Sequence, residues 1–127
     1  MIKFVINARP QPKERPYSIG RGKRRTPDRT VNFELTVKCE FRRQYPNHKP
    51  LTGPVGLHVA AKYKRPKTKK KGFWHTGPGD LDNIVKGISD GLNKLAWADD
   101  RQVAELTARK SWGESDMIQV WIWPLEE

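Results

Sequence analysis

The amino-acid sequence predicts an α+β fold, in which a mixed β-sheet of about four strands carries two packed helices. Three observations lead to this prediction. Apolar residues recur with helical spacing in two segments and with strand character in four others, and these segments follow one another as strand, helix, strand, helix, strand, strand. With 127 residues, the chain is long enough to bury one modest core. We therefore expect a single domain over residues 1–127.

The first half of the chain predicts a strand, a long loop and a helix. Residues Ile2 to Ala8 are rich in β-branched and aromatic side chains, which favour a strand. Arg9 to Arg29 is basic and interrupted by Pro and Gly, as in a solvent-exposed loop. Thr26 or Asp28 can cap a helix that runs to about Tyr45. On this helix we expect a broad apolar face made of Val31, Phe33, Leu35, Val37, Cys39 and Phe41.

The second half predicts three strands and a second helix. Gly53 to Tyr63 indicates a strand, and a basic loop follows near residues 62–78. Asp80 to about Leu95 has the spacing of a helix with one buried face. Gln102 to Trp112 and Met117 to Trp123 indicate two further strands, which we expect to pair as a hairpin across the short polar turn between them.

The charge of the chain favours a polyanionic partner or an anionic membrane surface. Lys and Arg number 25 against 14 acids, which gives a formal net charge of +11. Residues 1–78 carry 20 basic side chains and 4 acids, whereas residues 79–127 carry 5 and 10. A compact acidic set repels phosphate unless a bound divalent cation reverses the repulsion. The segregation of charge therefore indicates chemistry on a nucleic acid rather than binding alone.

Cysteine and histidine add little chemistry. Cys39 is the single cysteine, so an intrachain disulfide and a cysteine-based zinc site are excluded, and we interpret it as part of the helix core. His48, His58 and His75 lack the spacing of metal ligands. The N-terminal residues fit neither a signal peptide nor a membrane span, and we expect a cytoplasmic protein.

The segment GPGDLDNIVK contains the most informative residues. Asp80 and Asp82 lie at the start of the second helix, where both carboxylates can point beyond the helix end. Lys86 follows Asp82 at i+4 and shares its side of the helix, and Asp90 repeats this spacing. The glycines before Asp80 allow a phosphodiester backbone to approach closely.

The adjacent Asp99 and Asp100 come just before the next strand, and we expect this turn to return near the start of the second helix. Three carboxylates that converge need a cation to compensate their repulsion, and an all-oxygen ligand set suits Mg²⁺ or Mn²⁺. Such an ion would activate water and bind a phosphodiester oxygen, and Lys86 would stabilise the negative charge of the transition state.

The same residues also have a plain structural interpretation. Asp80 can serve as an N-cap, and Asp82 with Lys86 can form a surface ion pair of about 0.3–0.5 kcal/mol. The concurrence of Asn83, Asp99, Asp100 and a basic context favours the functional interpretation.

The pattern D-x-D-N-x-x-x-K followed by D-D-x-Q-V resembles the RusA family of Holliday-junction resolvases, most strongly from Gly79 to Leu106. The resemblance implies a RusA-like endonuclease fold. It implies that Asp80, Asp82 and Asp100 are catalytic metal ligands, that Lys86 is an essential lysine, and that Asp99 and Asn83 are accessory. It also implies a homodimer, bacterial or phage-encoded, that makes paired symmetric incisions in four-way DNA junctions during recombination and repair.

Contacts with DNA are expected from charge. The basic run from Lys64 to Lys71 lies next to Phe73, Trp74 and His75 in the sequence, and this composition suits phosphate contact and base stacking. We expect Trp97 and Trp112 in the core or a dimer surface, and Trp121 and Trp123 at a subunit interface. The expected DNA-binding residues are Lys13, Arg15, Arg24, Arg25, Lys64, Arg65, Lys67, Lys69, Lys70 and Lys71.

Two other functions remain open from the sequence. One is a metal-dependent nuclease that acts on other branched or hybrid nucleic acids. The other is a basic nucleic-acid-binding protein without enzymatic activity, which would bind with a steep salt dependence and release no cut products.

Overall fold

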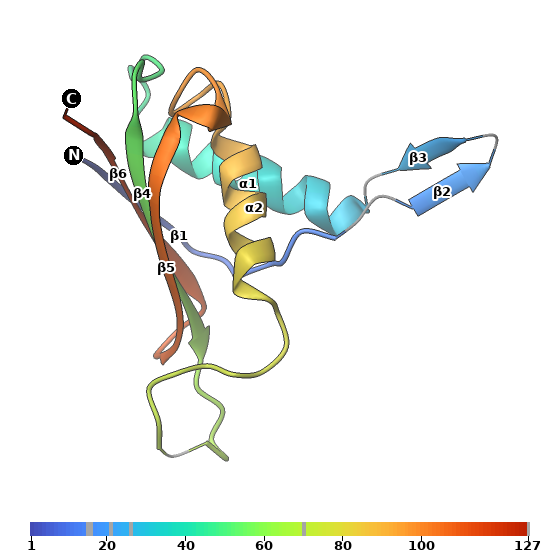
Figure 1. The fold of residues 1–127 in the computed structure, drawn as a ribbon. Helices are drawn as coiled ribbons and strands as arrows, with labels where there is room; N and C mark the ends of the chain where they lie inside the picture. The colour runs from blue at the N-terminus through green and yellow to red at the C-terminus, as the bar shows by residue number, and fades with distance from the viewer. Residues whose placement is uncertain (15–16, 21, 26, 70, 127) are drawn as a thin grey trace.

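The computed structural model describes residues 1–14, 17–20, 22–25, 27–69 and 71–126. Within them, a mixed sheet has the strand order β1-β6-β4-β5, as Figure 1 shows. Strand β4 is parallel to β5 and antiparallel to β6, which is in turn antiparallel to β1. The predicted α+β class, with about four strands and two helices, is confirmed. The strands are β1 (Ile2–Ile6), β4 (Val55–Lys64), β5 (Val103–Gly113) and β6 (Met117–Pro124).

Helices α1 (Asp28–Gln44) and α2 (Leu81–Leu92) lie on the same face of this sheet (Figure 1). The core between helices and sheet contains alternate residues of β1, β4 and β6, such as Phe4, Val59 and Val120. Trp97, which follows α2, is 0% exposed and belongs to this core, as one of the two expected placements has it. No helix in the described ranges combines the length and apolar composition that a bilayer crossing requires.

The predicted hairpin of the last two strands is wrong. Strands β5 and β6 follow each other in the chain, but β4 lies between them in the sheet. Strand β4 is buried along almost its whole length, and burial on both faces favours a central position over an edge. The connection after β5 therefore passes the end of β4, where the Lys64 backbone N–H donates to Asp116 Oδ1 at 2.7 Å.

The expectation of one continuous loop from Arg9 to Arg29 is also corrected. Strands β2 (Tyr17–Gly20) and β3 (Lys23–Arg25) form a separate antiparallel pair that projects away from the sheet (Figure 1). Gly20 and Gly22 have φ values of +101° and +74°, a backbone conformation that glycine adopts without steric strain. Arg24 on β3 is exposed.

Helix α1 buries a narrower face than predicted. Its buried residues are Thr30, Phe33, Val37 and Phe41, whereas Val31 is 42% exposed and Leu35 51% exposed, and Cys39 is exposed. One helix can present only one stripe to the layer beneath it. The stripe with two aromatic rings is selected, and the assignment of Cys39 to the core is wrong.

The two helices approach each other closely through glycines of α2. A Cβ added at Gly91 would lie 2.9 Å from Val37 Cβ, and one added at Gly87 would lie 3.5 Å from the Phe33 ring. Gly91 therefore has no room for a side chain, whereas a Cβ at Gly87 would make an ordinary van der Waals contact. Helix α2 is thereby held between α1 and the sheet, which fixes the placement of its polar face.

Candidate active site

Helix α2 begins after a turn that leaves the side chain of Asp80 without a capping role. Asp80 occupies the N-cap position with φ −72° and ψ 128°, but its side chain makes no capping hydrogen bond. Its backbone carbonyl instead accepts hydrogen bonds from the N–H groups of Asn83 and Ile84, both at 3.1 Å. The Asp80 and Asp82 side chains are exposed at this end of the helix. The plain N-cap interpretation of Asp80 is therefore not supported by a side-chain bond.

A lysine of the sheet holds the turn before Asp80. Lys110 Nζ donates to Gly79 O at 2.6 Å and to Gly77 O at 3.1 Å. Gly79 has φ +107°, and a Cβ there would lie 2.8 Å from Tyr63 Oη. The turn thus rests on β4 and β5 and requires glycine for two separate reasons. The sequence motif does not include Lys110. A lysine on the side of β5 that faces the helices is the feature of the sequence that could have identified it.

His75 is part of the scaffold beneath this turn. Its side chain is largely buried, with only 6% of the residue exposed, and its ring stacks on Tyr63 with a centroid distance of 3.9 Å. Burial, followed by the positive charges of Lys110 and Arg9, lowers the pKa of His75 and favours its neutral form. The expectation that His75 stacks on bases is corrected. Phe73 and Trp74, at 50% and 60% exposure, remain accessible.

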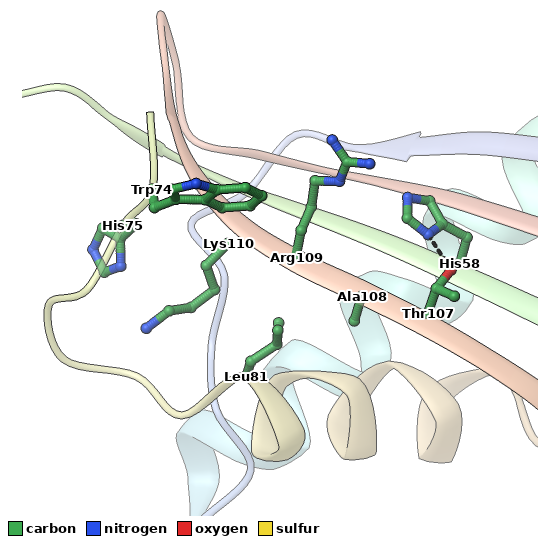
Figure 2. A pocket seen from close by; sticks show the side chains of 8 residues that line it. All are labelled: His58, Trp74, His75, Leu81, Thr107, Ala108, Arg109 and Lys110. Atoms are coloured by element: carbon green, nitrogen blue, oxygen red, sulfur yellow. Dashed lines mark hydrogen bonds between the residues drawn. The ribbon is translucent and has the colours of Figure 1, made fainter. Parts of the chain in front are cut away.

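A shallow hollow adjoins the start of α2. It has a volume of about 420 Å³ and wraps around strand β5. Figure 2 shows Trp74 lying across the strand while Arg109 and Lys110 leave it in opposite directions. Leu81, which separates the two aspartates, lines the same hollow. His58 Nδ1 at the far end is hydrogen-bonded to the Thr107 hydroxyl.

The exposed side of α2 continues with a lysine between two acids. Asp82, Lys86 and Asp90 are spaced at i, i+4 and i+8, which places them along one side of the helix. Lys86 Nζ lies 3.7 Å from Asp90 Oδ1, whereas no ion pair joins it to Asp82 in the described part of the chain. The structural interpretation expected an ion pair between Lys86 and Asp82, but Lys86 pairs with Asp90 instead.

Asp100 is hydrogen-bonded to residues near the C-terminal end of α2. Its Oδ1 accepts a hydrogen bond from the buried Trp97 indole N–H at 2.7 Å and one from the Ser89 hydroxyl at 3.5 Å. Ser89 is seven residues after Asp82, a rise of about 10 Å along the helix axis. The expectation that the turn with Asp100 returns to the start of α2 is not met within one chain.

Asp99 has a local structural task. Its side chain accepts a hydrogen bond from the Arg101 N–H at 2.9 Å, and its own N–H donates to Gln102 Oε1 at 2.8 Å. These bonds form a capping box for the short 3-10 helix Asp100–Gln102. The hydrogen bond from the Arg101 backbone lowers the pKa of Asp99 and keeps it ionised.

The ligand chemistry fits a hard cation, but the geometry of one chain fits it only in part. Asp80, Asp82 and Asp100 offer carboxylate oxygens, the ligands that Mg²⁺ prefers. In the ranges that the structure describes, however, no group of three or more His, Cys, Asp or Glu side chains is arranged to hold a metal ion. One chain therefore presents two acids at the start of α2 and the third near its end.

The predicted DNA-binding residues occupy three regions. Lys13 lies against α2, and Arg24 and Arg25 lie on β3. Lys64 ends β4, and Arg65, Lys67, Lys69 and Lys71 belong to the loop that follows it. Arg65 holds this loop through a hydrogen bond from its guanidinium to Gly72 O at 2.7 Å. Arg15 and Lys70 lie outside the described residues. The exposed lysines of the loop are Lys64, Lys67, Lys69 and Lys71.

Exposed carboxylates beside a lysine, on a chain of net charge +11, have the ligand chemistry for a hard cation next to a nucleic-acid phosphate. Residues 7–122 match the family described as Endodeoxyribonuclease RusA. The chain belongs to this family, as the motif predicts, and is an endodeoxyribonuclease.

Two relatives extend this comparison. Uncharacterized protein YqaN of Bacillus subtilis (strain 168) is 32% identical over 141 aligned positions, which cover 95% of this chain and 94% of the relative. Crossover junction endodeoxyribonuclease rusA of Lactococcus phage r1t is 34% identical over 68 residues, or 53% of this chain and 52% of the phage protein.

Proposed function

We propose that this endodeoxyribonuclease resolves four-way (Holliday) DNA junctions in recombination and repair, as an Mg²⁺-dependent homodimer that makes paired symmetric incisions. The observation that carries the proposal is the exposed pair Asp80 and Asp82, which the chain leaves without a capping bond on a turn fixed by Lys110. The printed name of the phage relative supports a junction as the substrate. A cytoplasmic location is expected from this substrate.

The proposed metal ligands are Asp80, Asp82 and Asp100, with Mn²⁺ as an alternative to Mg²⁺. When bound, the cation supplies charge neutralisation at the scissile phosphate and a water of lowered pKa. Lys86 binds the same phosphate and stabilises its developing negative charge. The expected room for the DNA backbone at Gly77 and Gly79 is not found, because a Cβ at these positions would meet His75 and Tyr63 of the protein itself. Asn83 and Asp99 are proposed as accessory residues at the two ends of the site.

We propose that the homodimer also completes the metal site, because the described residues of one chain do not bring Asp80, Asp82 and Asp100 together as a metal-binding group. A second chain offers its own Asp100, so the ligand set is complete if Asp80 and Asp82 of one protomer share the ion with Asp100 of the other. Two such sites related by a two-fold axis suit the symmetry of a four-way junction.

A mixing experiment tests the dimeric site. Asp82→Asn and Asp100→Asn are each expected to abolish cleavage of a synthetic four-way junction while junction binding survives. If the ligands come from both chains, a mixed dimer of these two variants regains one intact site and nicks the junction. If the mixed dimers are inactive, the shared site is excluded. Sedimentation analysis of the parent protein checks that it is a dimer.

Substrate choice is tested with a panel of DNA and hybrid substrates. Resolution predicts symmetric paired cuts in the four-way junction, in the presence of Mg²⁺ and not in EDTA. Faster cleavage of flaps, hybrids or linear duplex would instead support the alternative nuclease, and binding without cut products under all conditions would support the binding protein.

A further inference from the structure

The N-terminal segment before β2 lies directly against α2. The Lys13 N–H donates to Asn83 O in the first turn of α2 at 3.0 Å. The next residue, Glu14, donates its N–H at 3.0 Å to the hydroxyl of Thr30, which is 1% exposed. Lys13 is therefore fixed by its own backbone bond and by that of its neighbour, unlike a lysine in a solvent-exposed loop.

The side chain of Lys13 reaches a carboxylate that already contacts a second lysine. Lys13 Nζ donates a hydrogen bond to Asp90 Oδ2, while Lys86 Nζ lies 3.7 Å from the other oxygen, Asp90 Oδ1. The side chains of Asp90 and Lys13 are 18% and 27% exposed, and that of Lys86 is 63% exposed. A partly buried carboxylate thus connects one fixed and one exposed ammonium group.

The charges around Lys13 favour its protonated form. The hydrogen bond to Asp90 raises the pKa of Lys13, and the charges of Asp90, Glu34 and Asp100 act in the same direction. Burial raises the pKa of Glu34, which faces Lys13, Asp90, Lys38 and Lys86.

We propose that Asp90 is a positioning residue that holds Lys13 and Lys86 side by side, and that both lysines bind the DNA phosphate at the active site. The inference rests on the proposed function and deepens it, because it assigns Lys13 to the site itself rather than to the general DNA-binding surface. Asp90 neutralises one of the two charges and leaves the cluster with a net positive charge toward the phosphate. Without Asp90, two neighbouring ammonium groups would repel each other and turn away.

The alternative is that Asp90 and Lys13 only attach the N-terminal segment to α2. A structural ion pair changes the free energy of unfolding and does not separate the rate of cleavage from the affinity for DNA. A positioning carboxylate has the opposite signature, because its removal takes away negative charge near DNA and so preserves or strengthens binding while the cleavage step slows.

The test compares the parent protein with Asp90→Asn, Lys13→Gln, Lys13→Arg and the double variant Asp90→Asn/Lys13→Gln. Glu40→Gln, which breaks the exposed pair with Arg43 at 3.1 Å, and Lys3→Gln, which removes a lysine from the outer face of the sheet, serve as controls. Single-turnover cleavage is measured with saturating protein and Mg²⁺. Binding is measured with Ca²⁺ at several salt concentrations, and thermal unfolding is recorded for every variant.

We expect Asp90→Asn to slow cleavage by about ten- to a hundredfold, because misplacement of a charged group is that costly, without weaker binding. Lys13→Gln should slow cleavage as well and lower the salt dependence of binding by about one phosphate contact, whereas Lys13→Arg should regain most of the rate. The double variant should be no slower than the slower single variant, since the residues act as one unit. Both controls should cleave like the parent.

Equal cleavage by parent, Asp90→Asn and Lys13→Gln, with an unchanged salt dependence, would overturn the inference and leave the proposed function intact. A rate loss that follows a matching loss of unfolding temperature would also overturn it. If the parent cuts no junction, the proposed function fails, and the salt dependence alone decides whether Lys13, and not Lys3, contacts phosphate.

Discussion

The two ends of helix α2 carry aspartates in opposite states. At the N-terminal end, Asp80 and Asp82 are exposed and Asp80 makes no capping bond, although the turn beneath them is fixed by Lys110. At the C-terminal end, Asp100 accepts hydrogen bonds from Trp97 and Ser89. The protein itself provides hydrogen bonds to Oδ1 of Asp100 at one end, whereas the side chains of the acids at the other end are exposed. A rigid turn that bears unsatisfied carboxylates indicates a binding site more strongly than the number of acids does.

The largest expected effect is a loss of cleavage when an acid at the N-terminal end of α2 is replaced. Asp82→Asn should reduce junction cleavage by at least about a hundredfold, as removal of a charge-stabilising group commonly does, while the unfolding temperature stays unchanged. The measurement is single-turnover cleavage with Mg²⁺ beside thermal unfolding. Wild-type cleavage by this variant would remove Asp82 from the site.

The next largest effect is expected when the support of this end is removed and its carboxylates are kept. Lys110→Met loses the hydrogen bonds to Gly77 O and Gly79 O, so the turn no longer holds Asp80 in place, and cleavage should fall by about ten- to a hundredfold. Arg109→Met removes the same charge from the adjacent residue, which points the other way (Figure 2), and is expected to cleave like the parent. Equal rates for the two variants would show that the bonds of Lys110 do not matter.

Replacement of Asp100, at the C-terminal end of α2, should lower the free energy of unfolding. Asp100→Ala leaves the buried indole N–H of Trp97 without its acceptor, and an unsatisfied buried donor costs about 1–3 kcal/mol in the free energy of unfolding. Asp80→Ala, at the exposed end, should change this free energy very little. Urea denaturation of both variants measures the difference, and equal stability would contradict the contrast between the two ends.

The smallest effect concerns the buried histidine beneath the N-terminal end. The pKa of His75 is lowered in the folded protein from its ordinary value of 6.5, so the unfolded chain takes up a proton first as the pH falls. The stability is therefore complete above pH 6.5 and declines as the pH falls through the folded pKa. His75→Phe keeps a ring on Tyr63 and should show a smaller decline in unfolding temperature between pH 7 and pH 5. An unchanged decline would assign the effect to other groups, such as His58, whose pKa burial also lowers.

The sequence predicted both helices, the four strands of the main sheet and the acids at the start of α2, but not the β2–β3 pair or how the elements meet. Hydrophobic periodicity located both helices, and the D-x-D-N-x-x-x-K pattern located the start of α2. The hairpin prediction failed because a turn between β5 and β6 is a local signal, whereas the insertion of β4 between them depends on burial across the whole sheet. The contact of Lys110 with Gly79 and that of Lys13 with Asp90 join residues far apart in the chain, so no local pattern contains them.

Pairing of β1 with β6 has a consequence for the synthesis of this enzyme. Register partners such as Ile2 and Ile122 stand near opposite ends of the described chain, so β1 emerges from the ribosome long before its neighbour exists. Contacts of such high sequence separation form late in folding. A nascent or shortened chain without β6 lacks the strand that joins β1 to β4, so we expect incomplete copies of the protein to have no nuclease activity.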